Sequence, residues 1–184
     1  MRIGFSHDRV RALCEDAALL CAALALSYLE SLVPLYVLIP LPGAKIGLSN
    51  LAVLVAAHRR SFADAAIVSF TRVVLSAVLF GSIASLVFSF CGASCSLLVL
   101  ILMRRARKTW CSYVGVSVLC ASAHNTAQLV CAVFWMHETA LLPYLPGLLL
   151  LAVCSGTVVG FLMNCIAARF PSADGAEVFV CRDD

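Results

Sequence analysis

Charged side chains are scarce in this sequence. Asp, Glu, Lys and Arg together make up 12% of the 184 residues, whereas 62% are hydrophobic, and the mean hydropathy is +1.01. Soluble globular domains carry about 25% charged residues, and a soluble domain of this size could not bury so much apolar surface. The low charge therefore excludes a soluble protein and indicates a chain embedded in a membrane.

A nucleotide-binding motif is missing as well. The sequence contains no Gly-x-x-x-x-Gly-Lys-Ser/Thr string, the loop with which P-loop ATPases hold nucleotide phosphates. Any ATP-driven work would therefore need other subunits.

Six apolar stretches account for most of the chain. A helix needs about 20 apolar residues to cross the roughly 30 Å hydrocarbon core of a bilayer, and the stretches run near 17–33, 46–57, 63–80, 83–103, 111–136 and 141–168. We therefore expect one all-α integral membrane domain over residues 1–184, with six transmembrane helices. The second stretch is short for a bilayer, and the Pro-punctuated run 35–41 before it is expected to fold back into the outer leaflet.

The basic residues predict the orientation of these helices. With both termini in the cytoplasm, the cytoplasmic segments contain eleven of the 13 Lys and Arg residues, the outer loops contain only Lys45, and Arg72 lies within the third crossing. Lys and Arg concentrate in cytoplasmic loops, so we expect a multi-pass protein of the cytoplasmic (inner) membrane. Because the basic residues follow the topology, the net charge of +3 gives no reason to expect a nucleic-acid partner.

The ten cysteines fall mostly within apolar crossings, where a small polarizable side chain packs much like Ala or Ser. One cluster combines Cys120, His124, Gln128 and Cys131 on roughly one face of the fifth crossing. A zinc-type site needs three or four convergent ligands, and a single helix rarely presents them. We therefore expect no metal site and no cofactor.

Polar side chains inside the crossings point to a binding site. Each is costly when it faces lipid, about 2.5 to 3.5 kcal/mol for a central Arg or Asp. Of the seven polar residues within the crossings, only Asn164 falls near the inner face. The other six, Glu30, Asn50, Arg72, His124, Asn125 and Gln128, fall in the outer half of the predicted bundle, and Lys45 lies at its rim. We therefore expect an outward-facing pocket whose substrate-binding residues are Glu30, Lys45, Asn50, Arg72, His124, Asn125 and Gln128.

A structural interpretation of the same residues stays open. Glu30 and Arg72 could neutralise one another, and the amides could form interhelical hydrogen bonds worth about 0.6 kcal/mol each. Small residues leave a similar choice, since Gly156 and Gly160 in the sixth crossing have the small-xxx-small spacing that allows close helix packing. In the first crossing Ala18 and Ala22 have the same spacing, and there a partner protein is the alternative to internal packing.

Several strings resemble one family, the Gx transporters, also labelled heptaprenyl diphosphate synthase component I. The resemblance runs from about the first crossing to the sixth, through residues 25–34, 42–50, 72–76, 80–82 and 123–128. Its specific parts are Pro42-Gly-Ala-Lys45 and Ala123-His-Asn-Thr-Ala-Gln128; the rest is ordinary membrane composition.

That family in turn resembles the substrate-binding S components of energy-coupling factor transporters. Their six-helix fold opens its pocket to the outside, uses the loop between helices one and two as a lid, and docks a transmembrane coupling subunit through small residues on helix one. The resemblance implies a lid at Pro42 and Gly43 and partner docking at Ala18 and Ala22. It also implies that the chain transports a small solute, with an anionic solute as a candidate. The implied partners are a transmembrane coupling subunit and its ATPases.

The second family label names a prenyl diphosphate synthase, but this sequence lacks the metal-binding motif of that enzyme. A chain-elongating prenyl synthase binds diphosphate through Mg²⁺ held by Asp-rich clusters, because Mg²⁺ prefers carboxylate oxygens. The only adjacent aspartates here are Asp183 and Asp184, so we expect this chain not to be a catalytic synthase subunit. The alternative function is a non-catalytic membrane component of isoprenoid or quinone synthesis, partnered by a soluble prenyl synthase subunit. A purely structural membrane subunit comes third.

Overall fold

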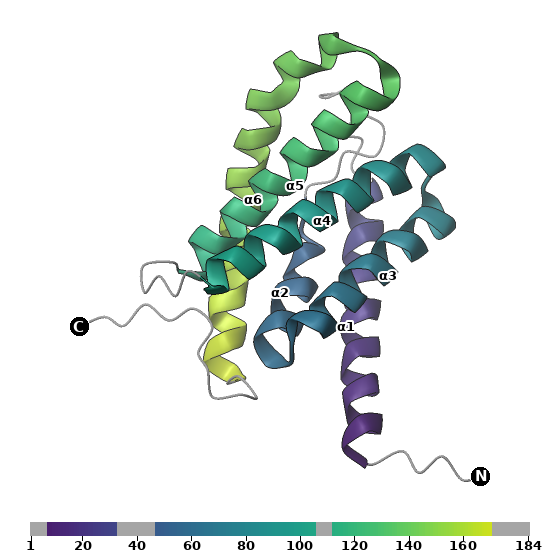
Figure 1. Cartoon of the computed structure of the whole chain (residues 1–184). Coiled ribbons are helices and arrows are strands. Elements are labelled where there is room, and N and C mark those ends of the chain that lie inside the picture. The colour runs from purple at the N-terminus through teal and green to yellow at the C-terminus, as the bar shows by residue number, and fades with distance from the viewer. Residues whose placement is uncertain (1–6, 33–46, 106–111, 171–184) are drawn as a thin grey trace.

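The computed structural model describes residues 7–32, 47–105 and 112–170. This part of the chain is all helical, which confirms the predicted fold class. The helices are α1 (His7–Leu32), α2 (Asn50–Arg59), α3 (Phe62–Phe80), α4 (Ile83–Arg105), α5 (Tyr113–Met136), the 3-10 helix η2 (Thr139–Tyr144) and α6 (Leu145–Arg169). In Figure 1, α2 lies in the middle of the bundle, packed against α1, α3 and α6, and α1 begins and α6 ends toward the same side of the molecule.

Five of the described helices are long and apolar enough to cross a membrane, namely α1 from Val10, α3, α4, α5 and the continuous η2–α6 segment. The second expected crossing, residues 46–57, is different. Its helix α2 has only 10 residues, which rise about 15 Å and so reach through half of the hydrocarbon core. A turn at Gly47, whose φ is 94°, precedes the helix and delays its start to Asn50.

Two apolar clusters form the core on either side of a polar layer. One cluster contains residues of all five helices from α2 through α6, among them Leu97 and Cys120. The other contains residues of α4, α5, η2 and the start of α6, among them Phe88 and Leu129. Along α5, His124 falls between Cys120 of the first cluster and Leu129 of the second. The polar layer therefore lies inside the bundle, where the apolar clusters shield it at both ends.

Helices α5 and α6 pack backbone to backbone through two glycines. A Cβ atom on Gly160 would lie 2.4 Å from the Cα atom of Val114, and one on Gly156 would lie 2.7 Å from the Cα atom of Val118. Both contacts are shorter than any real Cβ contact, so only glycine allows this approach. The small-xxx-small pair of α6 therefore serves internal packing.

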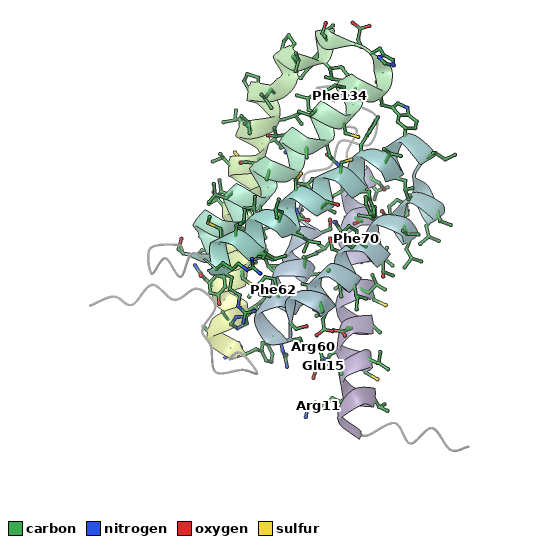
Figure 2. The ribbon with its side chains drawn as sticks, viewed as in Figure 1. Arg11, Glu15, Arg60, Phe62, Phe70 and Phe134 are labelled. Carbon is green, nitrogen blue, oxygen red and sulfur yellow. The ribbon has the colours of Figure 1, made fainter. Side chains whose placement is uncertain are left out.

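Charged residues gather where α1 approaches the α2–α3 corner (Figure 2). Arg60 Nε lies 3.2 Å from Asp64 Oδ2 and 3.4 Å from Asp16 Oδ1, and Arg11 Nε lies 3.3 Å from Glu15 Oε1. Such partly exposed pairs at the protein surface are worth about 0 to 1 kcal/mol each. They mark this end of the bundle as polar. Elsewhere on the helix surfaces, large apolar side chains such as Phe134 are exposed.

His58 links three helices near the same end. Its Nδ1 lies 2.9 Å from the Tyr113 hydroxyl, and its Nε2 lies 3.2 Å from the carbonyl oxygen of Phe170. In the tautomer that satisfies both contacts, Nε2–H donates to the carbonyl and Nδ1 accepts from the hydroxyl. This buried histidine therefore joins α2 to α5 and to the end of α6.

Candidate functional site

The structure buries six of the seven predicted substrate-binding residues inside the bundle. Their exposed fractions lie between 1% and 9%, although they come from four helices: Glu30, Asn50, Arg72, His124, Asn125 and Gln128. Asn164, the polar residue expected near the inner face, is exposed on α6. Polar groups at this depth are retained for hydrogen bonding inside the protein or with a ligand.

Ser49 is the residue on which two of the charged side chains meet. Its backbone N–H donates to Glu30 Oε1 at 3.0 Å, and its hydroxyl oxygen accepts a hydrogen bond from Arg72 Nη1. Arg72 Nη2 donates to Asn50 Oδ1 at 3.4 Å. Within the described residues Arg72 forms no ion pair, so Ser49 mediates between guanidinium and carboxylate.

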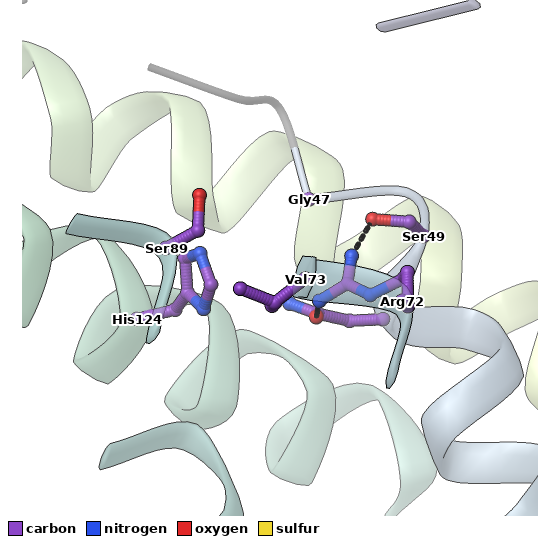
Figure 3. A pocket seen from close by; sticks show the side chains of 7 residues that line it. Gly47, Ser49, Arg72, Val73, Ser89 and His124 are labelled. Carbon is purple, nitrogen blue, oxygen red and sulfur yellow. Dashed lines mark hydrogen bonds between the residues drawn. The ribbon is translucent and has the colours of Figure 1, made fainter. Parts of the chain in front are cut away.

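A small cavity lies beside this group, between the start of α2 and helices α3, α4 and α5. Figure 3 shows Arg72 and Ser49 on one side of it and His124 and Ser89 on the other. The space that the centre of a water molecule can reach is about 10 Å³, which is room for about one water molecule. The cavity is lined by Gly47, Ser49, Asn50, Arg72, Val73, Ser89 and His124.

Several buried polar atoms around the cavity make no hydrogen bond within the described structure. They are Arg72 Nε, Asn50 Nδ2, Ser89 Oγ and, one helical turn beyond His124, Gln128 Nε2. A buried polar group left without a partner costs about 1 to 3 kcal/mol. Such a concentration in one layer is expected where a ligand or water completes the bonding.

Gly92 brings α4 against the polar face of α5. A Cβ atom at this position would lie 2.9 Å from Gln128 Cγ and 2.9 Å from His124 Cε1. Glycine is therefore required for His124 and Gln128 to occupy these positions beside α4. The residue positions the polar side chains without contributing a polar group of its own.

The buried residues of the predicted site differ in their relation to the cavity, and Gln128 lies one helical turn beyond His124 on α5, outside the cavity lining. Asn50, Arg72 and His124 line the cavity, whereas Glu30 is connected to it through Ser49. Asn125 lies in the α5–α6 interface, where its Nδ2 donates to the carbonyl oxygen of Leu148 at 3.1 Å. This is the interhelical hydrogen bond of the structural interpretation.

The remaining predictions concern the lid and the docking surface. Ala18 and Ala22 are exposed on α1, as a docking surface requires. Lys45, Pro42 and Gly43 lie outside the described residues, so the rim and lid assignments stay predictions.

Sequence reasoning missed Ser49, Ser89 and Gly92. A pattern was available for α4, because Ser85, Ser89 and Gly92 recur at the four- and three-residue spacing of one helix face, and all are buried. Ser49 offered only its place beside Asn50. A hydroxyl is inconspicuous in an apolar helix, because it can bond to its own backbone.

The fold and the cavity define a class: an all-α, multi-pass membrane component with a buried polar layer at its centre. The chain belongs to the family described as heptaprenyl diphosphate synthase component I, whose model matches residues 19–166. This match, from α1 into the last turn of α6, confirms the family resemblance read from the sequence. Comparisons with curated proteins and with solved structures find no match.

Proposed function

We propose that this chain is a substrate-binding membrane subunit, similar to an S component, that binds a small polar solute for transport. The observation that carries the proposal is the cavity at Arg72, where side chains from α2, α3, α4 and α5 converge. A bundle needing only stability gains little from a buried guanidinium, because desolvation offsets most of its interactions. A binding site gains a fixed, oriented donor.

The proposed membrane is the cytoplasmic one, with both termini in the cytoplasm and the pocket facing outward. Eleven of the 13 basic residues support this orientation. The half-length of α2 supports access from outside, since the helix runs from the cavity at Asn50 toward the charged end at Arg59. The chain between α1 and α2, with Lys45, Pro42 and Gly43, is then the proposed rim and lid.

The proposed partner is a transmembrane coupling subunit that works with ATPases. Helix α1 offers the surface for it, because only 11% of its apolar span is buried, against 33 to 50% for the other spans. Ala18 and Ala22 lie on the exposed part of α1, where small side chains let a second helix approach closely.

The test is to identify what the purified protein holds. The full chain is extracted in mild detergent, washed and denatured, and the released compounds are identified by mass spectrometry, with Arg72→Gln as the comparison. A small solute present in stoichiometric amount with the parent and depleted in the variant supports the proposal. No enrichment over a membrane-protein control, together with no solute uptake in cells expressing the complex, would refute it.

A second function is favoured by the family description itself. As component I of a heptaprenyl diphosphate synthase, the chain would be a non-catalytic membrane partner of a soluble prenyl synthase subunit in isoprenoid or quinone synthesis. Affinity purification of the tagged chain from its own cells separates the two functions. A coupling subunit with two ATPases supports transport; a prenyl synthase whose activity increases on adding the purified chain supports the alternative.

A further inference from the structure

We infer that the cavity binds the oxyanion group of its ligand, a carboxylate or a phosphate, with Arg72 as the counter-ion. This inference rests on the proposed function and names the chemical class of the solute. It depends on the bonding capacity, charge and space of the described residues around the cavity.

The bonding capacity is dominated by donors. Arg72 Nε and Asn50 Nδ2 are buried N–H groups without an acceptor in the described structure, and neither nitrogen can accept a hydrogen bond. Ser89 Oγ can donate as well, and it is also without a partner. A ligand that completes these bonds must supply oxygen acceptors, and an oxyanion supplies several in one compact group.

The charges around the cavity also favour an anion. Arg72 is only 4% exposed, and its two direct partners, the Ser49 hydroxyl and the Asn50 amide oxygen, are neutral. The start of α2 adds the positive end of a helix, equivalent to about half an elementary charge. The carboxylate of Glu30 accepts from the backbone N–H of Ser49 at that helix start. Its single negative charge therefore faces a full guanidinium charge and a partial helix charge.

A cationic ligand is disfavoured by the same geometry. It would bring a positive charge close to a guanidinium at a low effective dielectric constant, where repulsion is several times stronger than in water. A neutral solute could use the donors but would leave the single Glu30 charge to balance both the guanidinium and the positive start of α2. The discrimination expected from the site is therefore by charge first and by shape second.

Ser49 is the residue that the ligand displaces. The space for one water molecule is too small for a carboxylate or a phosphate, so binding must move a wall of the cavity. The Ser49 hydroxyl is the neutral acceptor on Arg72, and a charged oxygen forms a hydrogen bond roughly twice as strong. Exchange of the hydroxyl for the oxyanion would release the Ser49 side chain from Arg72, while the backbone N–H of Ser49 could keep its bond to Glu30.

The experiment measures thermal unfolding of the purified full chain in detergent. The probes are sodium phosphate, sodium pyrophosphate and sodium acetate, each compared with sodium chloride at equal ionic strength. A ligand that binds only the folded state raises the midpoint with its concentration. A lipid source of the same group is probed in nanodiscs of phosphatidylglycerol against phosphatidylcholine.

Three variants make the result specific to the cavity. Arg72→Gln removes the counter-ion and is expected to abolish the rise in midpoint. Ser89→Ala removes an unpartnered hydroxyl with little change in shape; it should fold like the parent and bind the effective probe about tenfold or more weakly. Arg105→Gln is the matched control, since it removes an exposed arginine at the end of α4 and should leave the rise unchanged.

Two outcomes of this unfolding experiment would overturn the inference. One is that no oxyanion, free or in a lipid headgroup, stabilises the parent more than chloride or phosphatidylcholine does; the other is equal stabilisation of the parent, Ser89→Ala and Arg72→Gln. If mass spectrometry finds a bound neutral or cationic solute that the complex transports, the inference fails and the proposed function stands. If only phosphatidylglycerol acts, and does so through Arg72 and Ser89, the oxyanion assignment stands and the transport proposal fails.

Discussion

Glu30 and Arg72 are held together by one residue that both of them bind. The backbone N–H of Ser49 donates to the Glu30 carboxylate, and the Ser49 hydroxyl accepts from the Arg72 guanidinium. The arrangement ties the end of α1 and the middle of α3 to the turn that starts α2. It differs from a direct ion pair, because the two charges are joined through the neutral Ser49.

Removing the Ser49 hydroxyl should therefore destabilise the protein. Ser49→Ala leaves Arg72 Nη1 without its acceptor, and the loss of a hydrogen bond to a charged group costs about 1.5 to 3 kcal/mol. The backbone bond to Glu30 is retained. Thermal unfolding in detergent measures the change, and Ser94→Ala is the control, because the Ser94 hydroxyl bonds only to the carbonyl oxygen of Phe90 in its own helix. Equal midpoints for the two variants would contradict the role of Ser49.

A double-mutant cycle tests whether Glu30 and Arg72 serve only each other. Each single change to Gln should destabilise strongly, about 3 to 5 kcal/mol as for other broken buried charge pairs. The double variant should recover part of the stability, because Ser49 transmits the coupling. Anion-dependent stabilisation, in contrast, should stay absent. Its return in the double variant would leave Arg72 with a structural role alone.

The packing of α5 on α6 predicts opposite effects for two glycines. Gly160→Ala places a Cβ atom against the backbone of Val114, so the helices must separate, at a cost of about 1 to 3 kcal/mol. Gly147→Ala, in the same helix, meets no atom within 4 Å and should be neutral or slightly stabilising. Thermal unfolding of the two variants side by side checks this difference. A Gly160→Ala protein as stable as the parent would contradict the close approach.

The proposed docking surface on α1 is tested by larger side chains. Ala18→Leu and Ala22→Leu should abolish copurification of the coupling subunit and transport, because large side chains prevent close helix approach. Solute binding by the isolated chain should survive, since both residues are exposed and distant in sequence from the cavity residues. Loss of folding in either variant would instead indicate internal packing.

Reporter fusions test the predicted orientation in the membrane. A reporter at residue 106 or at the C-terminus should read cytoplasmic, and one at His137 should read external, because the basic residues divide so unequally between the two sides. A cytoplasmic signal at His137 would show that the bundle is inverted or that a predicted crossing is absent.

The sequence singled out part of the candidate site because some residues are too costly in a membrane to be accidental. Arg72 and His124 stand out in apolar helices, and burial within the protein is the only inexpensive solution for them. Ser49 and Ser89 do not stand out, since a serine can bond to its own helix and cross a membrane at little cost. Asn125 is the reverse case. The sequence shows that an amide at this place in a membrane helix needs a hydrogen-bond partner, but only the structure shows that the partner is the carbonyl oxygen of Leu148 on α6.

The sequence by itself determined the all-α class and the long apolar spans, because lipid offers no hydrogen bonds and the backbone must satisfy itself within each helix. The family followed from local strings of residues. Only the tertiary structure decided that the second crossing is a half-length helix starting at the cavity, that Ser49 mediates between Glu30 and Arg72, and that Gly156 and Gly160 face α5. These features depend on which helices pack together and at what depth, and hydrophobic periodicity along one segment contains no information about its neighbours.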